Sequence, residues 1–567
     1  MLPPHPRLVF RLALPLLMAA LATPVRSQSV VDFNTAIAGL TGSPTFVIAN
    51  FQQSGTGVPS FIYRSGGLAA AAGTGQFNAT GINANSLAAA VAANEYFILE
   101  LFPESGNAID YSQLSVRFQS SAAGATNASF QGANTGFGDS APSNLQQFAI
   151  NPSGAPSPPA SYAFATGGAY SNVTNDQALR LYVWGAANAS GTTSITQFQL
   201  AGLVSGRWTG AGADDDVASG ANWGSGAAPV ATQGLQFEGS TRLAPLVNSA
   251  TSAAGVRFAA GASSFTLGGS GTLALSTGVN APLAIANYSV NQQIINTALA
   301  VGTNQTWNAF AGDLAIGGPV DLGANDLTVA GSFGTTLSGS VSGSGSLTKT
   351  GTGTLVLSGG NTYSGATTVN EGTLRIDGTN AGAGEVTVNG GKLGGTGSIA
   401  GTTTANGGIL APGASAGNLT IGGGLSMNAG AYEWDLAALT TAGPGSNYDL
   451  VTIGGGTSTI GGSAAVTVNF IGSASDPDSG AAFWNANRQW TIVNQTAGTL
   501  SGAFGGVTNA NWAIGTFAVA TTGNQIVLQW SFTPVPEPNT AVLALLATVL
   551  ALGGAGRRAM RKGDLRP

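Results

Sequence analysis

Carboxylates are the side chains of this chain whose spacing could do chemistry. Glu433 with Asp435, and Asp476 with Asp478, have the i, i+2 spacing that puts both members of a pair on one face of a strand. Two carboxylates are the minimum that glycoside hydrolysis requires. The chain has no cysteine and one histidine, His5, which excludes Cys-His catalysis, thiol redox chemistry and zinc sites built from these ligands.

Both carboxylate pairs are better explained by structure than by catalysis. Glu433 and Asp435 alternate with Trp434 and Leu436, which is the pattern of a strand with one exposed and one buried face. The segment 476–480 has the composition of a turn. Active-site carboxylates usually have basic partners, and residues 28–556 include only 10 Lys and Arg. We therefore predict no catalytic residue, with a carbohydrate-active lyase or glycosidase as the alternative.

Two further groups could bind ions or transfer protons. Asp214–Asp216 are three consecutive carboxylates, and only a bent loop could bring all three to one calcium ion, because consecutive strand residues point to opposite faces. A solvated acidic turn is the simpler interpretation, with calcium as the alternative. The only lysines of residues 28–556, Lys349 and Lys392, lie inside repeat motifs, which favours a structural role. No metal and no cofactor are predicted.

The composition indicates which elements must position these groups. Of 567 residues, 86 are Gly and 7% are charged, against about 25% charged in an ordinary soluble domain. So many glycines argue against a helix-rich enzyme, while 43% apolar residues and a mean hydropathy of +0.21 argue against disorder. We expect an all-β protein of two to four domains.

The N-terminus has the pattern of a secretory signal peptide at residues 1–27. Arg7 and Arg11 precede an apolar run at 12–23, and a signal peptidase would cut between Ser27 and Gln28. A membrane anchor is the alternative, but this run is shorter than the roughly 20 residues that span a bilayer. Cleavage would remove His5 and exclude Ser-His-Asp catalysis as well.

The C-terminus, residues 533–567, combines three elements in a fixed order. Pro536-Glu537-Pro538 comes first, followed by an uncharged run at 540–556 that is predicted to be a transmembrane helix. A basic cluster follows, which would keep the C-terminus in the cytoplasm: Arg557, Arg558, Arg561 and Lys562.

This order resembles the PEP-CTERM sorting signal of Gram-negative bacteria. The resemblance implies that an exosortase, a membrane-embedded transpeptidase-like protease, recognises the Pro-Glu-Pro motif and removes the helix. Alternating prolines favour an extended backbone that a protease cleft can accept. A plain C-terminal anchor behind a proline-rich stalk is the alternative.

The charges divide between the termini and the body. Residues 28–556 carry 10 basic and 23 acidic side chains, a net charge of −13, although the whole chain has −6. The exported body is thus acidic, and nucleic acid is excluded as a partner.

Residues 28–205 are predicted to form a β-sandwich of jelly-roll type. Segments such as 113–118 alternate apolar and polar residues, with Leu114, Val116 and Phe118 on one face. A short helix is expected over 86–94. Tyr182 and Trp184 alternate with apolar neighbours, so they form either a platform for sugars or aromatics that a second sheet covers.

Residues 206–532 are predicted to form a right-handed parallel β-helix. Gly-x-Leu motifs recur at 353–355, 372–374, 391–393 and 408–410, at spacings of 19, 19 and 17 residues. A period near 20 with short alternating strands indicates a solenoid whose corners are occupied by Gly and Asn.

The segment 345–377 resembles the autotransporter-associated β-strand repeat. The matching residues are Leu347, Lys349, Gly351, Gly353, Thr354, Leu355, Leu357, Asn361, Thr362, Tyr363, Gly365, Thr367, Val369, Gly372, Thr373 and Leu374. An autotransporter ends in a membrane β-barrel, whereas this chain ends in a predicted helix and a basic tail, so export by a barrel of its own is not implied.

Together these patterns predict a secreted, non-enzymatic protein of the bacterial surface or extracellular matrix. Its expected partners are signal peptidase, an exosortase-like protease and extracellular polysaccharide. A lectin-like module or a carbohydrate-active enzyme is the alternative.

Overall fold

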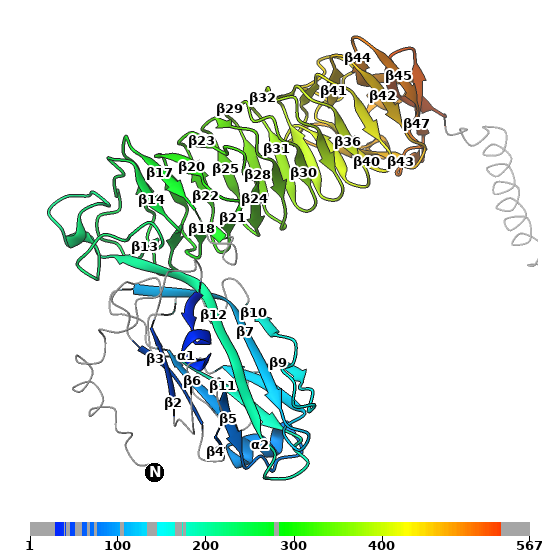
Figure 1. The fold of residues 1–567 in the computed structure, drawn as a ribbon. Coiled ribbons are helices and arrows are strands. Elements are labelled where there is room, and N and C mark those ends of the chain that lie inside the picture. Colours follow the sequence, from blue (N-terminus) through cyan, green and yellow to red (C-terminus); the bar gives the residue numbers. More distant parts are fainter. Residues whose placement is uncertain are drawn as a thin grey trace, which may run out of the picture. The chain divides into compact units, whose positions relative to one another are not determined.

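The computed structural model describes residues 29–38, 40, 46–50, 59–64, 68–72, 76–101, 107–132, 144–164, 173, 177–276 and 283–534 (Figure 1). The chain divides into two compact units, Met1–Leu314 and Ala315–Pro567. Both consist mainly of β-strands, which confirms the predicted β-rich class.

The first unit begins with two antiparallel sheets. One has the strand order β2-β3-β6-β11-β8-β9, and the other is built around the long strands β7 and β12, which pair with β1, β4, β5 and β10 directly or through a neighbour. Their bounds are β1 (Ser29–Asp32), β2 (Phe46–Asn50), β3 (Pro59–Arg64), β4 (Ala69–Ala70), β5 (Phe77–Thr80), β6 (Tyr96–Leu101), β7 (Asn107–Ser120), β8 (Asn127–Gly132), β9 (Asn144–Ala149), β10 (Ala160–Ala163), β11 (Gln177–Trp184) and β12 (Thr193–Trp208).

The two antiparallel sheets share one apolar cluster. Strands β6 and β11 contribute Leu99 and Leu181, while β7 contributes Leu114, Val116 and Phe118. The predicted buried face of 113–118 is therefore confirmed. The jelly-roll sandwich over 28–205 stays a prediction, as does its boundary at residue 205.

Two short helices accompany these sheets, α1 (Asn34–Ala38) and α2 (Leu87–Ala93). The Ser86 side chain accepts a hydrogen bond from the backbone N–H of Ala89, and Asn94 closes α2 in the left-handed conformation with φ 54°. Both are common helix caps. The helix predicted over 86–94 is confirmed.

Strand β12 leads from the antiparallel sheets into a stack of coils (Figure 1). It pairs antiparallel with β7 as far as Gly206, and from Ser205 it also pairs in parallel with the first coil strand, β13. Arg257 of β15 donates to Asp110 of β7 at 2.7 Å. The Arg257 side chain is 2% exposed, so a buried ion pair joins the first coils to the preceding sheet.

The coils of the first unit form three sides of parallel strands. The first side has β13 (Gly234–Phe237), β15 (Gly255–Phe258), β18 (Leu283–Asn287) and β21 (Gln305–Ala309). The second has β14 (Thr251–Ala253), β17 (Thr272–Leu275) and β20 (Ala298–Val301). The third has β16 (Thr266–Leu267) and β19 (Gln293–Ile295), followed by β22 (Leu314–Ile316) at the boundary of the units. A 3₁₀ turn, η2 (Gly220–Asn222), precedes them.

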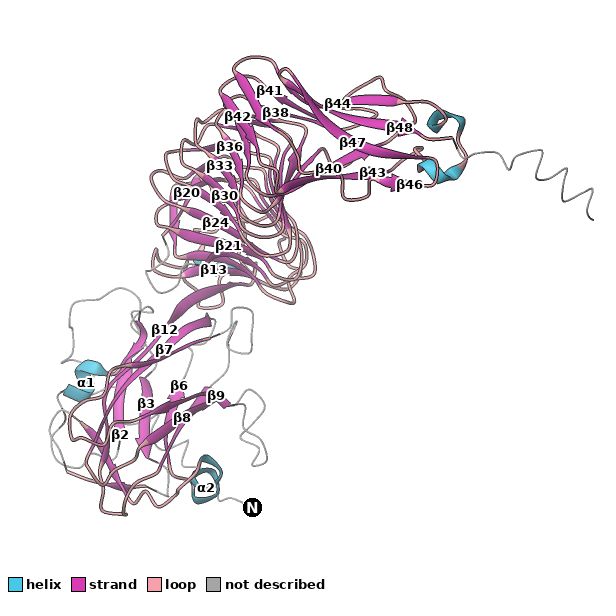
Figure 2. Cartoon of the chain, turned by 90° about the vertical axis from the view of Figure 1, so that its right-hand side faces the viewer, coloured by secondary structure: helices cyan, strands magenta, loops and turns pink. Residues whose placement is uncertain are grey.

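The second unit repeats this coil architecture in parallel register, which Figure 2 shows as short strands joined by tight corners. Its first side has β24 (Leu327–Gly331), β27 (Leu347–Lys349), β30 (Thr367–Val369), β33 (Val386–Val388), β36 (Thr403–Ala405), β39 (Leu425–Met427), β42 (Thr457–Ile460) and β45 (Thr499–Gly502). Its second has β25 (Thr335–Leu337), β28 (Thr354–Leu357), β31 (Thr373–Ile376), β34 (Lys392–Gly395), β37 (Ile409–Pro412), β40 (Gly430–Leu436) and β43 (Ala464–Phe470). Its third has β29 (Gly360–Asn361), β32 (Thr379–Asn380), β35 (Ser398–Ile399), β38 (Asn418–Ile421), β41 (Leu450–Ile453) and β44 (Arg488–Gln495), and β23 (Val320–Asp321) pairs with β26 (Val341–Ser342).

These parallel sides are consistent with the predicted β-helix; its right-handed sense stays a prediction.

The last coil is closed by antiparallel strands, since β44 pairs with β48 (Gln525–Phe532), β48 with β47 (Gly515–Thr522), and β47 with β46 (Asn511–Trp512). The 3₁₀ turns η3 (Pro477–Ser479) and η4 (Ala482–Trp484) lie beside them. Trp484, Trp490, Phe517 and Trp530 pack edge to face or at a tilt and fill this end.

The two predicted targeting segments fall on parts of the chain outside the described residues. This holds for the signal peptide at 1–27 with its cleavage site Ser27/Gln28, for Pro536, Glu537 and Pro538, for the helix at 540–556, and for Arg557, Arg558, Arg561 and Lys562. Within the described ranges, no helix has both the length and the apolar character needed to cross a membrane.

Candidate functional site

The repeat segment 345–377 is one full coil and the start of the next. Its apolar positions point into a narrow core, where Leu355, Leu357, Leu374 and Ile376 are fully buried. The intervening residues Val356 and Arg375 are only partly buried. This alternation is what a strand of one coil requires, because one face packs in the core and the other faces outward.

The motif spacings equal the lengths of successive coils. Leu355 pairs in register with Leu374, Leu374 with Leu393, and Leu393 with Leu410. The spacings of 19, 19 and 17 residues therefore mark equivalent positions of four stacked strands, as predicted.

Two repeat glycines are required by close contacts and backbone angles. A Cβ on Gly353 would lie 2.0 Å from the carbonyl oxygen of Phe333 in the preceding coil. Gly372 has φ +70°, a left-handed conformation that favours glycine. Any side chain at Gly353 would thus force the coils apart.

Lys349 closes a corner of the coil from inside. The residue is 2% exposed, and its ammonium donates to the carbonyl oxygens of Thr350 at 2.7 Å, Gly351 at 2.6 Å and Glu371 at 3.4 Å. Burial lowers the pKa of Lys349 to about 8, and the Glu371 carboxylate partly offsets this shift. All three donors of the ammonium are therefore used on backbone groups, which agrees with the structural role predicted for Lys349.

A second polar group of the repeat is also satisfied inside the coil. The Tyr363 hydroxyl lies 2.7 Å from Thr367 Oγ1 and accepts from the Asn380 amide at 3.2 Å. Asn361 accepts from the backbone N–H of Val341 at 3.0 Å. The polar positions of the repeat thus link neighbouring coils.

The pair Glu433 and Asp435 lies on the outer face of β40, as its alternation predicted. Trp434 between them is fully buried. Glu433 forms an ion pair with Lys392, and Asp435 accepts from the Asn469 amide at 3.0 Å. Both carboxylates are engaged in contacts between coils.

A third carboxylate near this pair, Asp449, is not among the candidate functional groups predicted from the sequence. It is 1% exposed, and its two oxygens accept from the backbone N–H groups of Gly417 at 2.7 Å and Asp435 at 3.0 Å. Burial raises the pKa of Asp449 to about 8, and the charges of Asp435 and Glu433 raise it further, while the two N–H donors oppose the shift. No local pattern marks this carboxyl, because its partners come from two coils: Gly417 precedes β38 in one, and Asp435 belongs to β40 in the next.

The pair Asp476 and Asp478 lies in a turn, as predicted. Pro477–Ser479 form a 3₁₀ turn that Gly480 ends at φ +79°. Asp478 accepts from the backbone N–H of Ala513 at 3.0 Å. Its carboxylate therefore ties two loops together.

The aspartates 214–216 form a loop in which each carboxylate has a partner elsewhere in the first unit or in the loop itself. Asp214 accepts from Ser219 Oγ at 2.8 Å and from the Asp216 N–H at 3.0 Å, and these hydrogen bonds lower the pKa of Asp214. Asp215 forms an ion pair with Arg242 at 2.7 Å. Asp216 accepts from the Asn248 amide at 3.0 Å.

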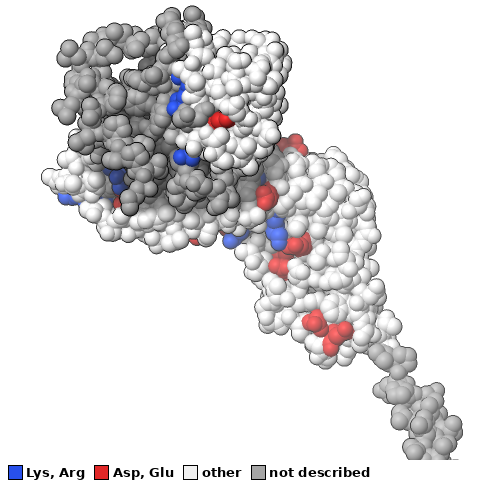
Figure 3. Space-filling model, turned by 90° about the horizontal axis from the view of Figure 1, so that it is seen from below, with Lys and Arg blue, Asp and Glu red and all other residues white. Residues whose placement is uncertain are grey.

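The calcium alternative gains no support from this loop, because its carboxylates point to different partners. Over the described ranges, no three His, Cys, Asp or Glu side chains are grouped so as to hold a metal ion. On the face shown in Figure 3, acidic and basic side chains form small scattered groups.

The proposed sugar platform at Tyr182 and Trp184 is wrong. Helix α2 covers both rings, which are buried in a small cluster with Ala84 and Ala90. The alternative of burial is correct, although a helix rather than a second sheet provides the cover.

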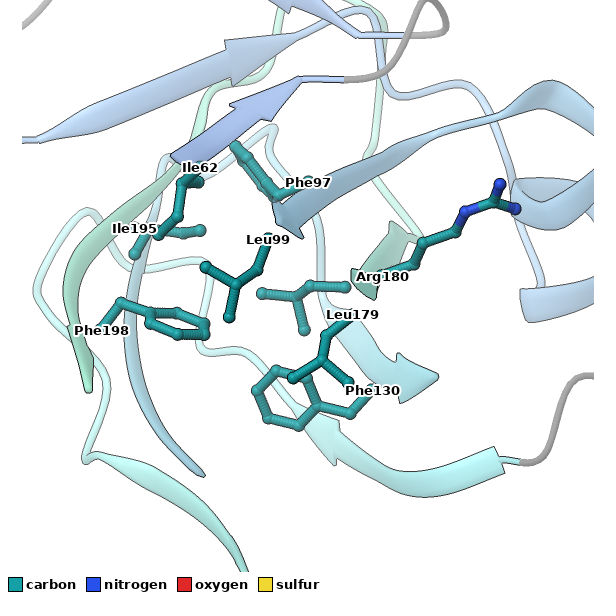
Figure 4. A pocket seen from close by; sticks show the side chains of 9 residues that line it. Ile62, Phe97, Leu99, Phe130, Leu179, Arg180, Ile195 and Phe198 are labelled. Atoms are coloured by element: carbon teal, nitrogen blue, oxygen red, sulfur yellow. The ribbon is translucent and has the colours of Figure 1, made fainter. Parts of the chain in front are cut away.

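A cavity of the first unit does not offer a ligand site either. It lies between the two antiparallel sheets, and Figure 4 shows apolar side chains filling it while the Arg180 guanidinium points away. The space left between these side chains has room for at most one water.

Comparison with known protein families supports the resemblance of this segment to a known repeat. The family model of the passenger-associated-transport-repeat matches residues 347–376. No curated protein matches the chain. This repeat family is associated with autotransporter passenger domains, which is compatible with a protein exposed at the cell surface.

Proposed function

We propose that this chain is an exported, non-enzymatic structural or adhesive protein of the surface or extracellular matrix of a Gram-negative bacterium, associated with exopolysaccharide. The observation that carries the proposal is the stack of coils around the passenger-associated repeat at 347–376. Its buried polar side chains hold backbone groups of neighbouring coils, so the stack serves as a rigid support.

The non-enzymatic part of the proposal is supported by what the carboxylates do. Glu433 bonds Lys392, Asp435 bonds Asn469, and Asp478 bonds a loop N–H. A pair acting in glycoside hydrolysis needs one protonated and one ionised group facing a sugar across a cleft. Here the side chains are engaged in structural contacts instead.

The sorting part of the proposal rests on the C-terminal sequence. An exosortase-like protease would recognise Pro536-Glu537-Pro538 and release the body from the helix at 540–556, after signal peptidase has cut at Ser27/Gln28. Glu537 is the only charge of the motif, so it is the recognition group that we expect the protease to contact.

The test is fractionation of the tagged chain in its own host, comparing wild type with Glu537→Ala. We expect the wild type to be shortened and recovered outside the inner membrane, and Glu537→Ala to keep its full length in the inner-membrane fraction. Glu371→Ala, which removes an exposed glutamate of the body, is the control and should behave as the wild type. Normal processing of Glu537→Ala would refute the sorting mechanism.

A further inference from the structure

One side of the second unit presents a row of hydroxyl groups in exact register. The middle residues of eight successive strands pair with one another through the backbone. They are Thr328, Thr348, Thr368, Thr387, Thr404, Ser426, Thr459 and Ser501. In the first seven strands the neighbours of the middle residue are buried in the core, so its side chain faces outward, and Ser501 in the last strand is itself exposed.

A row of asparagines runs beside the central hydroxyls, two residues further along four of the strands. Asn389 donates to Asn370 at 3.1 Å, Asn406 to Asn389 at 3.1 Å, and Asn428 to Asn406 at 2.9 Å. Each amide is thus held in one orientation by its neighbour. We name the eight hydroxyl residues and these four asparagines the Thr–Asn face.

The Thr–Asn face has unused hydrogen-bonding groups. Over the described part of the chain, no side-chain hydrogen bond engages the hydroxyls of Thr348, Thr368 and Thr387, whereas Thr404 donates to Glu385 at 2.7 Å. The two rows contain no charged residue and no aromatic ring. Ordered amides and free hydroxyls lose little conformational entropy when a ligand binds.

The dimensions of the face argue against a second copy of the chain as its occupant. Adjacent strands lie about 4.8 Å apart, so eight rungs span about 34 Å. From each hydroxyl residue to the asparagine two positions on, the face is three residues or about 10 Å wide. Two such faces would bury roughly 700 Å² in total, less than the 1,200 Å² at the lower end of stable interfaces. The net charge of −13 on residues 28–556 would also repel a second copy.

The chemistry fits an extended, uncharged, hydroxyl-rich polymer. Sugar hydroxyls and Thr or Asn groups each both donate and accept hydrogen bonds. One rung of the stack advances by roughly the length that one hexose adds to an extended β-linked chain. An acidic polysaccharide would be repelled by the acidic body.

We propose that the Thr–Asn face binds a neutral, linear polysaccharide lying along the axis of the coil stack, with its hydroxyls bonded to successive rungs. Single exposed hydrogen bonds contribute little, but a chain that contacts several rungs at once gains the affinity of a multivalent ligand. This inference rests on the proposed association with exopolysaccharide and identifies the surface and the class of glycan.

The test uses the mature full chain and cosedimentation with particles of two insoluble neutral glucans, one β-1,4-linked and one β-1,3-linked, and with an alginate gel as the acidic glycan. The variant Thr368→Val/Thr387→Val removes two adjacent hydroxyls, which pair in register, and keeps the side-chain shape. The control Thr420→Val/Thr452→Val makes the same substitution at two paired outward positions of β38 and β41, where the Thr452 hydroxyl donates to Asn418 at 3.0 Å. Equal melting temperatures establish that both variants fold.

We expect the wild type to sediment with at least one neutral glucan and not with alginate. Loss of two hydrogen bonds should weaken this binding about tenfold in Thr368→Val/Thr387→Val, while the control stays within about twofold of the wild type.

Five results would overturn the inference: no binding to either glucan, equal binding to alginate, undiminished binding by Thr368→Val/Thr387→Val, equal loss in the control, or self-association of the wild type that Thr368→Val/Thr387→Val abolishes. The last result would assign the face to a second copy. None of these results changes the outcome for Glu537→Ala, which tests export and sorting separately.

Discussion

Asp449 should make the stability of the second unit fall as the pH rises from mildly acidic to neutral. Its carboxyl is 1% exposed and titrates with a pKa of about 8 in the folded chain, against an ordinary value of 3.8. Between these two values the folded state holds a proton that the unfolded state has released. The stabilising effect is therefore complete below the unfolded pKa and is lost as the pH rises through the folded pKa.

The size of the effect follows from linkage. One extra bound proton changes the free energy of unfolding by about 1.4 kcal/mol per pH unit. From pH 5 to pH 7 this is a loss of about 2.7 kcal/mol. For a unit of about 250 residues, such a loss lowers the melting temperature by about 5–10 °C.

The assay is thermal melting followed by circular dichroism between pH 5 and pH 8, comparing wild type with Asp449→Asn. Asp449→Asn is uncharged at every pH, but its amide has one oxygen where two N–H groups donate. It should therefore melt below the wild type at pH 5 and keep that melting temperature at pH 7. Asp321→Asn, at an exposed aspartate, should follow the wild-type profile. If wild type and Asp449→Asn give parallel profiles, the hydrogen bonds from Gly417 and Asp435 hold the carboxylate ionised, and the reasoning is refuted.

Three further substitutions test the polar contacts of the stack. Lys349→Met leaves three backbone carbonyls without their donor and should lower the free energy of unfolding by about 2–4 kcal/mol in urea titrations, whereas an unchanged midpoint would show that water replaces the ammonium. Arg257→Met removes the buried cation that pairs with Asp110 and should lower the free energy of unfolding by about 3–5 kcal/mol, with faster hydrogen exchange in β13 and β15. Unchanged exchange would show that this ion pair does not stabilise the first coils. Asn389→Ala removes two exposed amide hydrogen bonds and should lower the free energy of unfolding by about 1 kcal/mol in the same urea titrations. Asn248→Ala, which removes one exposed amide hydrogen bond in the first unit, is the variant with which it is compared.

The sequence was sufficient to predict the coils because their signal is local and repeated. Leu355, Leu374, Leu393 and Leu410 recur at nearly constant spacing, and each spacing equals one turn of the stack. The alternation around Trp434 likewise placed Glu433 and Asp435 on the outer face. A period and an alternation require no knowledge of distant residues.

The errors arose where a distant element decides burial. The alternation of Tyr182 and Trp184 correctly separated two faces of β11, but it could not show that α2, some 90 residues earlier, covers one of them. The burial of Asp449 is likewise not a local property. The residue is 1% exposed, and one of the N–H groups that its carboxyl accepts belongs to Gly417 of the preceding coil, 32 residues earlier in the chain.

The corners of the coils explain why polar side chains lie inside a core that the apolar alternation would assign to apolar residues. A coil must turn within a few residues, and its corners leave carbonyl and N–H groups that the parallel ladders do not pair. Burying such a group without a partner costs about 1–3 kcal/mol, and the corner repeats in every coil. Lys349 and Asn361 supply partners from within the stack. Polar residues at fixed repeat positions are therefore as much a part of the fold as the leucines, and their presence in the repeat is no sign of catalysis.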